Sequence, residues 1–356
     1  MAIKLGASSY SWQLSYYLGK MSLEDCIAHL SSIGGTGFEL IPEQMLPGDN
    51  FARLDSGFVA TWHEWMAKYQ MIPTCLDHFD DYNLYRNRTL TCQEQIDLSE
   101  NYLKIARQLG FPCIRVLSTT PFEVLEQLIP MAEEYGVKLG LEIHAPLSMK
   151  SEWAEKWQEM IYRTGSNFAG FIPDFGIFCR QPPLVYTDNL VHQGARREIV
   201  DYIVDCYVKI QEARINSIND HKGVNSLLEI SSDILSLEEE VRKMGATPLE
   251  LSIFRIRNIY DNPQWIVDVL PLIVHVHAKF YNVVDNGKGG YTDPSVDTER
   301  VVRILRDSGY DGYLSSEYEG PFYTLLFGGH DPIEPLDERE AVRRHHVMLR
   351  SILDES

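Results

Sequence analysis

The fold and the site are decided by four stretches of sequence: GLEIHAP at 140–146, GFIPDFG at 170–176, IVHVHAKF at 273–280 and GYLSSEYEG at 312–320. Each is an apolar run, typical of a buried strand, that closes on an ionisable side chain and is followed by a turn. These four side chains are Glu142, Asp174, His277 and Glu317. In a barrel of parallel strands the carboxyl ends of all strands meet at one face. We therefore expect the four side chains to converge there.

The rest of the chain repeats the same alternation of short apolar runs and helical patterns, which predicts parallel βα units. Eight such runs are present, the number that closes an α/β barrel. The sequence thus predicts an α/β fold, a (β/α)8 TIM barrel that forms a single domain over residues 1–356. The predicted strands are Ile3–Ser9, Gly37–Ile41, Ile72–Leu76, Cys113–Leu117, Lys138–Ile143, Ala169–Pro173, Ile273–Lys279 and Gly312–Glu317.

Helical patterns with one apolar face fill the intervals between these strands. Several of them end in glycine directly before the next strand, as at Gly34, Gly110, Gly136 and Gly309, which suits a left-handed helix cap. The predicted helices are Ser22–Ile33, Phe58–Tyr69, Cys92–Leu109, Glu123–Tyr135, Ser151–Arg163, Thr298–Asp307 and Asp337–Leu353.

One connection, between strands six and seven, is much longer than the others and spans about residues 177–271. It contains helical patterns at Arg196–Ala213, Leu235–Met244 and Pro263–Val269. Long connections on the carboxyl-terminal face of a barrel often build a lid or a partner surface. A helical decoration without a role in the site is the alternative.

Charge and composition exclude several classes of function. The chain of 356 residues carries 32 Lys and Arg against 51 Asp and Glu, a formal net charge of −19. We expect no nucleic-acid partner, because affinity for phosphates depends on basic side chains, and no anionic membrane partner for the same reason. No apolar run of about 20 residues is present, and because the first residues, MAIKLGASSYSW, predict a strand, we expect no signal peptide. Six scattered cysteines suggest reduced thiols and a cytoplasmic location.

The four strand-end residues have the chemistry of a site for a divalent metal. Three carboxylates and a neutral imidazole make a hard, oxygen-rich ligand set. Each carboxylate alone is more typical of a turn or helix cap, and a lone histidine in an apolar strand is more typical of a core residue. Four such residues on successive strands favour a metal. Side chains alternate across a strand, so His144, Lys279 and Glu319 should point into the same cavity. His275 shares that side but lies deeper, which favours a structural or supporting role.

These motifs resemble the xylose isomerase-like barrels, a family that includes sugar isomerases, ketose 3-epimerases and inosose dehydratases. The most specific matches are HVHAKF at 275–280 and GYDGYLSSEYEG at 309–320. The similarity covers most of the chain outside the insertion. It implies that the metal ligands are Glu142, Asp174, His277 and Glu317, and that the ion is Mn²⁺, with Mg²⁺ or Co²⁺ as alternatives.

Within this family, EIHAP, FIPDFGIF, HVHAKFY and SSEYEG look closer to the larger, alpha subunit of bacterial C-glycoside deglycosidases. That resemblance implies a keto-sugar substrate, a 3-oxo-C-glycoside whose carbon–carbon bond is cleaved by a lyase, and a small beta subunit in a hetero-oligomer. The alternative is a sugar isomerase, a ketose 3-epimerase or an inosose-dehydratase-like enzyme, although FGIFCR after Asp174 departs from the epimerase pattern of a following histidine. A non-catalytic partner protein is a more remote alternative.

The resemblance and the strand positions together suggest roles for further residues. His144 is the candidate general base, because an imidazole accepts a proton near neutral pH; orienting a ligand is its alternative role. Lys279 is expected to offset the carboxylate charge and to contact a sugar oxygen, and Glu319 to act as an acid, a base or a spare ligand. The substrate-binding candidates are Tyr10 and Trp12, by stacking, and Asp77 and His78, for which a loop role is equally open.

Other enzyme classes have little support in the sequence. A metal-dependent endonuclease shares this barrel in some relatives, but it would need more strand-end histidines and a basic groove. The motifs GxSxG, HExxH and GxGxxG are absent, so acyl transfer and hydride transfer are not indicated.

Overall fold

The computed structural model describes residues 2–46, 54–79, 83–217, 232–256, 260–327, 329 and 331–355. Eight parallel strands form one sheet in the order β6–β5–β4–β3–β2–β1–β10–β7. Two backbone bridges, Phe171 with Ile273 and Asp174 with His277, link β6 to β7 and bring the sheet close to a closed barrel. The predicted fold class is confirmed. The strands are β1 Lys4–Ser8, β2 Gly37–Leu40, β3 Ile72–Asp77, β4 Cys113–Val116, β5 Lys138–Ile143, β6 Ala169–Pro173, β7 Val276–Phe280 and β10 Tyr313–Tyr318.

Closure of the barrel explains the largest error in the predicted strand bounds. Strand β7 begins at Val276 and not at Ile273, because Ile273 pairs with β6 only through a single bridge. Gly170 of β6 lies against the carbonyl of Leu272 in this region, and a Cβ at Gly170 would collide with that oxygen. A glycine is therefore required where the two ends of the sheet meet.

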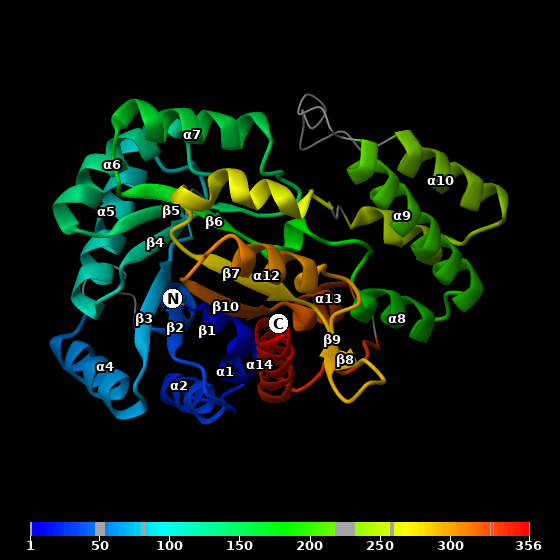
Figure 1. The fold of residues 1–356 in the computed structure, drawn as a ribbon, viewed down its shortest axis with the longest axis horizontal. Coiled ribbons are helices and arrows are strands. Elements are labelled where there is room, and N and C mark those ends of the chain that lie inside the picture. The colour runs from blue at the N-terminus through cyan, green and yellow to red at the C-terminus, as the bar shows by residue number, and fades with distance from the viewer. Residues whose placement is uncertain are drawn as a thin grey trace.

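Helices cover the outer face of the barrel, and short segments follow several strands at their carboxyl ends (Figure 1). Every helix predicted outside the insertion is present, with bounds within two residues of those expected. These elements are η1 Ser9–Trp12, α1 Gln13–Tyr17, α2 Leu23–Ser32, α3 Pro42–Met45, α4 Ser56–Tyr69, α5 Cys92–Leu109, α6 Phe122–Tyr135, α7 Glu152–Thr164, η2 Phe175–Ile177, α12 Thr298–Asp307, α13 Gly320–Phe327 and α14 Glu338–Asp354.

Local hydrogen bonds fix where the long helices begin and end. The Thr91 hydroxyl accepts from the Glu94 amide, and the Glu94 carboxylate accepts from the Thr91 amide, which forms a capping box at the start of α5. The same helix ends at Gly110, whose φ of 82° lies in the left-handed region that glycine adopts without strain. Gly136 ends α6 in the same way, as the sequence predicted.

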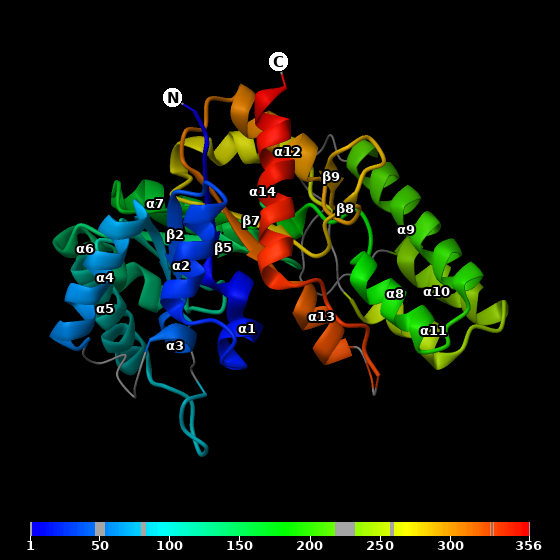
Figure 2. The same cartoon turned by 90° about the horizontal axis from the view of Figure 1, so that it is seen from below.

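Most of the long connection after β6 folds into a helical unit beside the barrel (Figure 2). The helices of this unit pack around their own apolar cluster, which includes Leu190, Ile203 and Val241, whereas Trp265 and Ile266 near the end of the connection pack into the core of the barrel. The two helical patterns expected near 196–213 and 235–244 are confirmed, whereas α8 was not predicted and the segment after Pro263 is a 3-10 helix. The elements are α8 Leu184–His192, α9 Arg197–Ser217, α10 Ser232–Lys243, α11 Pro248–Leu251, η3 Ser252–Arg255 and η4 Pro263–Leu272.

Figure 2 also shows how the molecule is oriented: both termini lie at one end of the barrel, and α1, α3 and α13 lie at the opposite end. These three helices follow strands, so they mark the carboxyl-terminal face. A small hairpin of β8 Val284–Asp285 and β9 Tyr291–Thr292 follows β7, and the glycine-rich residues 287–290 form its turn. Among the described helices, none combines the length and the apolar character needed to cross a bilayer.

Candidate active site

The four strand-end residues converge at the carboxyl-terminal face of the barrel. Glu142 is the second-last residue of β5, and Asp174 directly follows β6. His277 lies in β7, and Glu317 lies in β10. All four side chains are buried, and each offers one ligand atom within 4.8 Å of the others. The geometry expected from the sequence is therefore present, and the four residues could hold one metal ion.

The imidazole of His277 lies among the three carboxylates. Its Nδ1 atom is 2.8 Å from Glu142 Oε1, 3.7 Å from Glu317 Oε2 and 3.9 Å from Asp174 Oδ2. Glu317 Oε2 is buried and makes no hydrogen bond with any described residue. A buried carboxylate oxygen without a hydrogen-bond donor is costly, and a hard divalent cation would satisfy it.

Electrostatics in this cluster also fit a cation. Burial raises the pKa of Asp174 well above its usual range, and the neighbouring Glu317 and Glu142 raise it further. Burial opposes ionisation of Glu142 too, but Arg115 and His277 outweigh it and hold the pKa of that carboxyl well below its usual range. Buried carboxylates this close together cannot all ionise without positive charge between them. A bound dication would supply that charge.

Lys279 supplies part of the compensation within the protein. Its Nζ atom lies 3.1 Å from Asp174 Oδ2, 3.5 Å from Glu317 Oε2 and 3.6 Å from Glu319 Oε2. The side chain is 3% exposed, yet these carboxylates outweigh burial and raise the pKa of Lys279 well above its usual value. Lys279 is therefore a fixed positive charge beside the four candidate ligands.

A cavity of about 490 Å³ opens beside this cluster, and the three candidate catalytic side chains His144, Lys279 and Glu319 all line it. The nearby charge of Lys279, followed by burial, lowers the pKa of His144 to about 4, so the imidazole is neutral at pH 7. Burial raises the pKa of the Glu319 carboxyl to about 7. The cavity thus presents a neutral imidazole and a carboxyl that is partly protonated near neutral pH. No described residue of the insertion lines this cavity.

The two aromatic candidates after β1 have different positions. Tyr10 lines the cavity. Trp12 is fully buried, stacks on Phe38 with ring centres 6.3 Å apart, and presents its ring edge to His29. The side chain of Trp12 belongs to the core, so its position lends no support to the predicted stacking on a sugar.

Asp77 and His78, at the end of β3, are fully buried and do not line the cavity. Asp77 Oδ1 lies 3.3 Å from Arg115 Nε, and burial together with a neighbouring glutamate raises the pKa of Asp77 to about 8. The His78 ring stacks on Tyr102 at 4.0 Å, and its Nε2 atom is 2.9 Å from Ser99 Oγ. These contacts are structural, and direct binding of a substrate hydroxyl by either residue remains a prediction.

Two residues beside the candidate ligands were not identified from the sequence. Glu39 in β2 contacts His275 Nε2 at 2.7 Å and lies 3.4 Å from His277 Nε2 on the side of the ring opposite the carboxylates. Arg115 in β4 lies 3.3 Å from Glu142 Oε2. Glu39, His275 and His277 could themselves approach one ion, but neither Glu39 nor His275 lines the cavity. A charged residue inside an apolar strand was the available signal for both Glu39 and Arg115.

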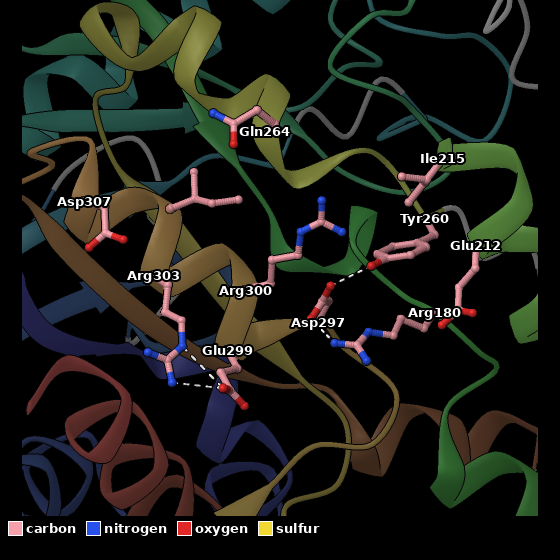
Figure 3. Close-up of a pocket in the computed structure, with 11 residues that line it drawn as sticks. Arg180, Glu212, Ile215, Tyr260, Gln264, Asp297, Glu299, Arg300, Arg303 and Asp307 are labelled. Carbon is pink, nitrogen blue, oxygen red and sulfur yellow. Dashed lines mark hydrogen bonds and ion pairs between the residues drawn. The ribbon is translucent and has the colours of Figure 1, made fainter. Parts of the chain in front are cut away.

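A second cavity, of about 660 Å³, lies between the insertion and α12 (Figure 3). Four of its charged groups pair with one another: Asp297 accepts from the Tyr260 hydroxyl at 2.6 Å and pairs with Arg180, and Arg303 pairs with Glu299 at 3.0 Å. None of the residues singled out in the sequence lines it. The ionisable groups singled out in the sequence converge at and beside the barrel cavity instead.

Comparison with known proteins agrees with this geometry. Residues 27–203 match the family model described as a xylose isomerase-like TIM barrel. The chain is 30% identical over 358 residues to the C-glycoside deglycosidase alpha subunit of Arthrobacter globiformis, covering 99% of this chain and 93% of that protein. It is 27% identical over 357 residues to the 3'-dehydrocarminate deglycosidase alpha subunit of a Microbacterium species, covering 99% and 96%. A solved structure of L-ribulose 3-epimerase has a TM-score of 0.54 at 13% identity, covering 99% of this chain and 95% of that one, which is a likeness of fold alone.

Proposed function

Because this chain belongs to the xylose isomerase-like TIM barrel family, and is related over nearly its full length to C-glycoside deglycosidase alpha subunits, we propose that it cleaves the carbon–carbon bond of 3-oxo-C-glycosides. The observation that carries the proposal is the convergence of Glu142, Asp174, His277 and Glu317 beside a cavity lined by His144. These groups provide what removal of a proton next to a ketone requires.

The four convergent residues are the proposed ligands of a divalent cation, Mn²⁺ in the first instance, with Mg²⁺ or Co²⁺ as alternatives. When bound there, such an ion would act as a Lewis acid toward the sugar ketone and a neighbouring hydroxyl. Lys279 would keep the ligand cluster from carrying an uncompensated negative charge, since its Nζ atom lies within 3.5 Å of both Asp174 and Glu317. The same ammonium group faces the cavity, where it can donate to a sugar oxygen.

His144 is the proposed general base. It lines the cavity, and the charge of Lys279 keeps its imidazole unprotonated at neutral pH, so that it can accept the proton from the carbon next to the ketone. The electron pair of the broken C–H bond forms the enolate. As the enolate collapses, a double bond forms in the sugar and the bond to the aromatic carbon breaks.

The departing aromatic carbon keeps the bonding electrons and must take up a proton. Glu319 is the proposed donor, because its carboxyl lines the same cavity and burial raises its pKa to about 7. In this reaction one proton leaves the sugar to His144 and one proton is delivered by Glu319, so the charges balance. The relatives are named alpha subunits, which supports a smaller beta subunit as a partner of this chain as well. The cytoplasmic location stays a prediction.

The decisive experiment separates the lyase from a ketose 3-epimerase, the alternative that shares the deprotonation step. Metal-loaded protein, with and without a candidate beta subunit, is incubated in deuterated water with a 3-oxo-C-glycoside and, separately, with ketohexoses. Release of the free aglycone supports the lyase. Deuterium incorporation with inversion and no release would replace it by an epimerase, and the absence of both exchange and release would refute both.

A further inference from the structure

A groove of about 650 Å³, distinct from both cavities described above, adjoins the catalytic cavity, and Tyr10 lines both the groove and the catalytic cavity. On one side its wall is formed by η1 and α1, with Gln13, Tyr16 and Tyr17. On the other side the wall is formed by α13, with Phe322 and Leu325. Helices α1 and α13 both lie at the carboxyl-terminal face of the barrel (Figure 2). The groove is therefore on the face where the candidate active site opens.

Both walls continue directly from residues of the catalytic cavity. After β1 the chain passes from Tyr10, in the cavity, to Gln13 and Tyr17 in the groove. After β10 it passes from Glu319, in the cavity, to Phe322 only three positions later. A ligand with its reacting atom near Glu319 can therefore extend past Tyr10 into this groove.

The wall formed by η1 and α1 is held to the rest of the protein by hydrogen bonds and is thus already formed. The Ser11 hydroxyl donates to the Ser316 carbonyl at 2.9 Å and accepts from the Tyr318 amide at 2.9 Å, which ties η1 to β10. The buried carboxylate of Glu338 accepts from the amides of Leu14 and Ser15 at 3.0 and 2.7 Å. A preformed wall lowers the ordering cost of binding a ligand.

The chemistry of the lining selects an aromatic ligand. Tyr17 is 85% exposed and Leu325 is 51% exposed, an unusual degree of exposure for two large apolar side chains on one groove. The lining contains one charged side chain, Glu43, and no basic one. Flat rings and aliphatic groups favour a planar aromatic system, and the amide of Gln13 can hydrogen-bond a phenolic hydroxyl.

We propose that this groove binds the aromatic aglycone of the substrate while the catalytic cavity holds the oxidised sugar. The inference rests on the proposed function, because it assigns the second half of the same substrate. It also gives Tyr10 a place at the junction between sugar and aglycone, where its ring contacts both.

The test measures binding of a free planar phenol, which requires neither catalysis nor metal. Equilibrium dialysis with naphthol is performed on the full chain and on the variants Tyr17→Ala and Leu325→Ser. The matched controls are Tyr162→Ala on α7 and Leu235→Ser on α10, since those side chains are 66% and 47% exposed and lie outside the groove. Each groove variant should weaken naphthol binding by about tenfold, the loss of one good aromatic or aliphatic contact, and the controls should not.

All four substitutions affect exposed side chains, so each protein should fold as the parent does. Equal naphthol affinity for groove variants and controls would overturn the inference. So would loss of binding to a protein partner in the groove variants while naphthol still binds with parental affinity. A protein that binds naphthol through Tyr17 and Leu325 but leaves 3-oxo-C-glycosides intact would refute the proposed function alone. Cleavage without any dependence of phenol binding on these residues would refute the groove assignment alone.

Discussion

Nδ1 of His277 and Oε1 of Glu142 lie 2.8 Å apart, although 135 residues separate them in the chain. The same two atoms are the ones that would face a common metal ion. His277 Nε2, on the other side of the ring, lies 3.4 Å from Glu39 Oε1. Nδ1 therefore faces the candidate ligand carboxylates, whereas Nε2 lies near Glu39 without a hydrogen bond to any described residue.

Replacement of Glu142 tests the metal centre. The Glu142→Gln variant should lose bound Mn²⁺ and activity together, with metal affinity at least about tenfold weaker, because a neutral amide is a poorer ligand for a hard dication. Metal content is measured by mass spectrometry after dialysis against defined Mn²⁺. The control is Glu152→Gln at the start of α7, where the side chain is 68% exposed and pairs with Lys156. Full metal content in Glu142→Gln would show that the cluster is not the metal site.

Replacement of His144 separates turnover from metal binding. The His144→Ala variant should retain the parental metal content and lose kcat by about 10²–10⁴-fold, the usual contribution of a general base. His192→Ala, on α8 with a side chain 45% exposed, serves as the control and should change neither quantity. Parental turnover in His144→Ala would assign the base to another residue.

Glu39 should act through His277 and not on the substrate. We expect Glu39→Gln to weaken Mn²⁺ affinity by about 10–100-fold, because a negative charge 3.4 Å from the His277 ring is lost. Saturating Mn²⁺ should restore most of kcat, which would not happen if Glu39 took part in the chemistry. The exposed Glu123→Gln on α6 is the control, and titration of activity against Mn²⁺ is the measurement. An unchanged metal affinity would contradict this role.

The position of Trp12 predicts an effect on stability. Because the side chain is fully buried against Phe38, Trp12→Ala should lower the free energy of unfolding by about 3–5 kcal/mol. The exposed Tyr162→Ala should change it by less than about 0.5 kcal/mol. Chemical denaturation at neutral pH gives both values. A stable Trp12→Ala protein with a raised KM would instead support the substrate contact predicted from the sequence.

Buried histidines should make the protein sensitive to acid. Burial, with the nearby Arg115, lowers the pKa of His78 from 6.5 to about 3, so in the window between these values the unfolded chain binds a proton that the folded chain does not. The free energy of unfolding should therefore fall as the pH falls from about 6.5, by up to about 1.4 kcal/mol per pH unit for this residue.

The His78→Phe variant keeps a ring against Tyr102 and removes the titrating group. Between about pH 4 and pH 6, the slope of its free energy of unfolding against pH should be smaller than that of the parent by up to about 1.4 kcal/mol per pH unit. Denaturant titrations across this range, with the exposed His63→Phe as control, give the two slopes. Parallel slopes for His78→Phe and the parent would show that His78 is not held neutral in the fold.

The sequence was sufficient for the fold because its signals are local. Apolar runs of strand length, Ser or Thr caps such as Thr91, and glycine ends such as Gly110 each act within a few residues. These local signals were less accurate where the bounds of a strand depend on pairing with a strand far away in the sequence. Strand β7 starts later than its apolar pattern suggests, because the register at the closing seam depends on β6.

For the candidate site, sequence alone determined which side chains stand at the ends of neighbouring strands, since the alternation of a strand and the common direction of parallel strands place Glu142, Asp174, His277 and Glu317 at one face. Only the tertiary structure decided that Glu39 and Arg115 flank them and that Trp12 turns into the core. It also decided that helices α8, α9 and α10 of the insertion lie beside the barrel (Figure 1). The physical reason is the distance along the chain over which each effect acts. The direction in which a side chain points follows from its own strand, but its neighbours across the barrel depend on the stagger and closure of strands that are far apart in the sequence.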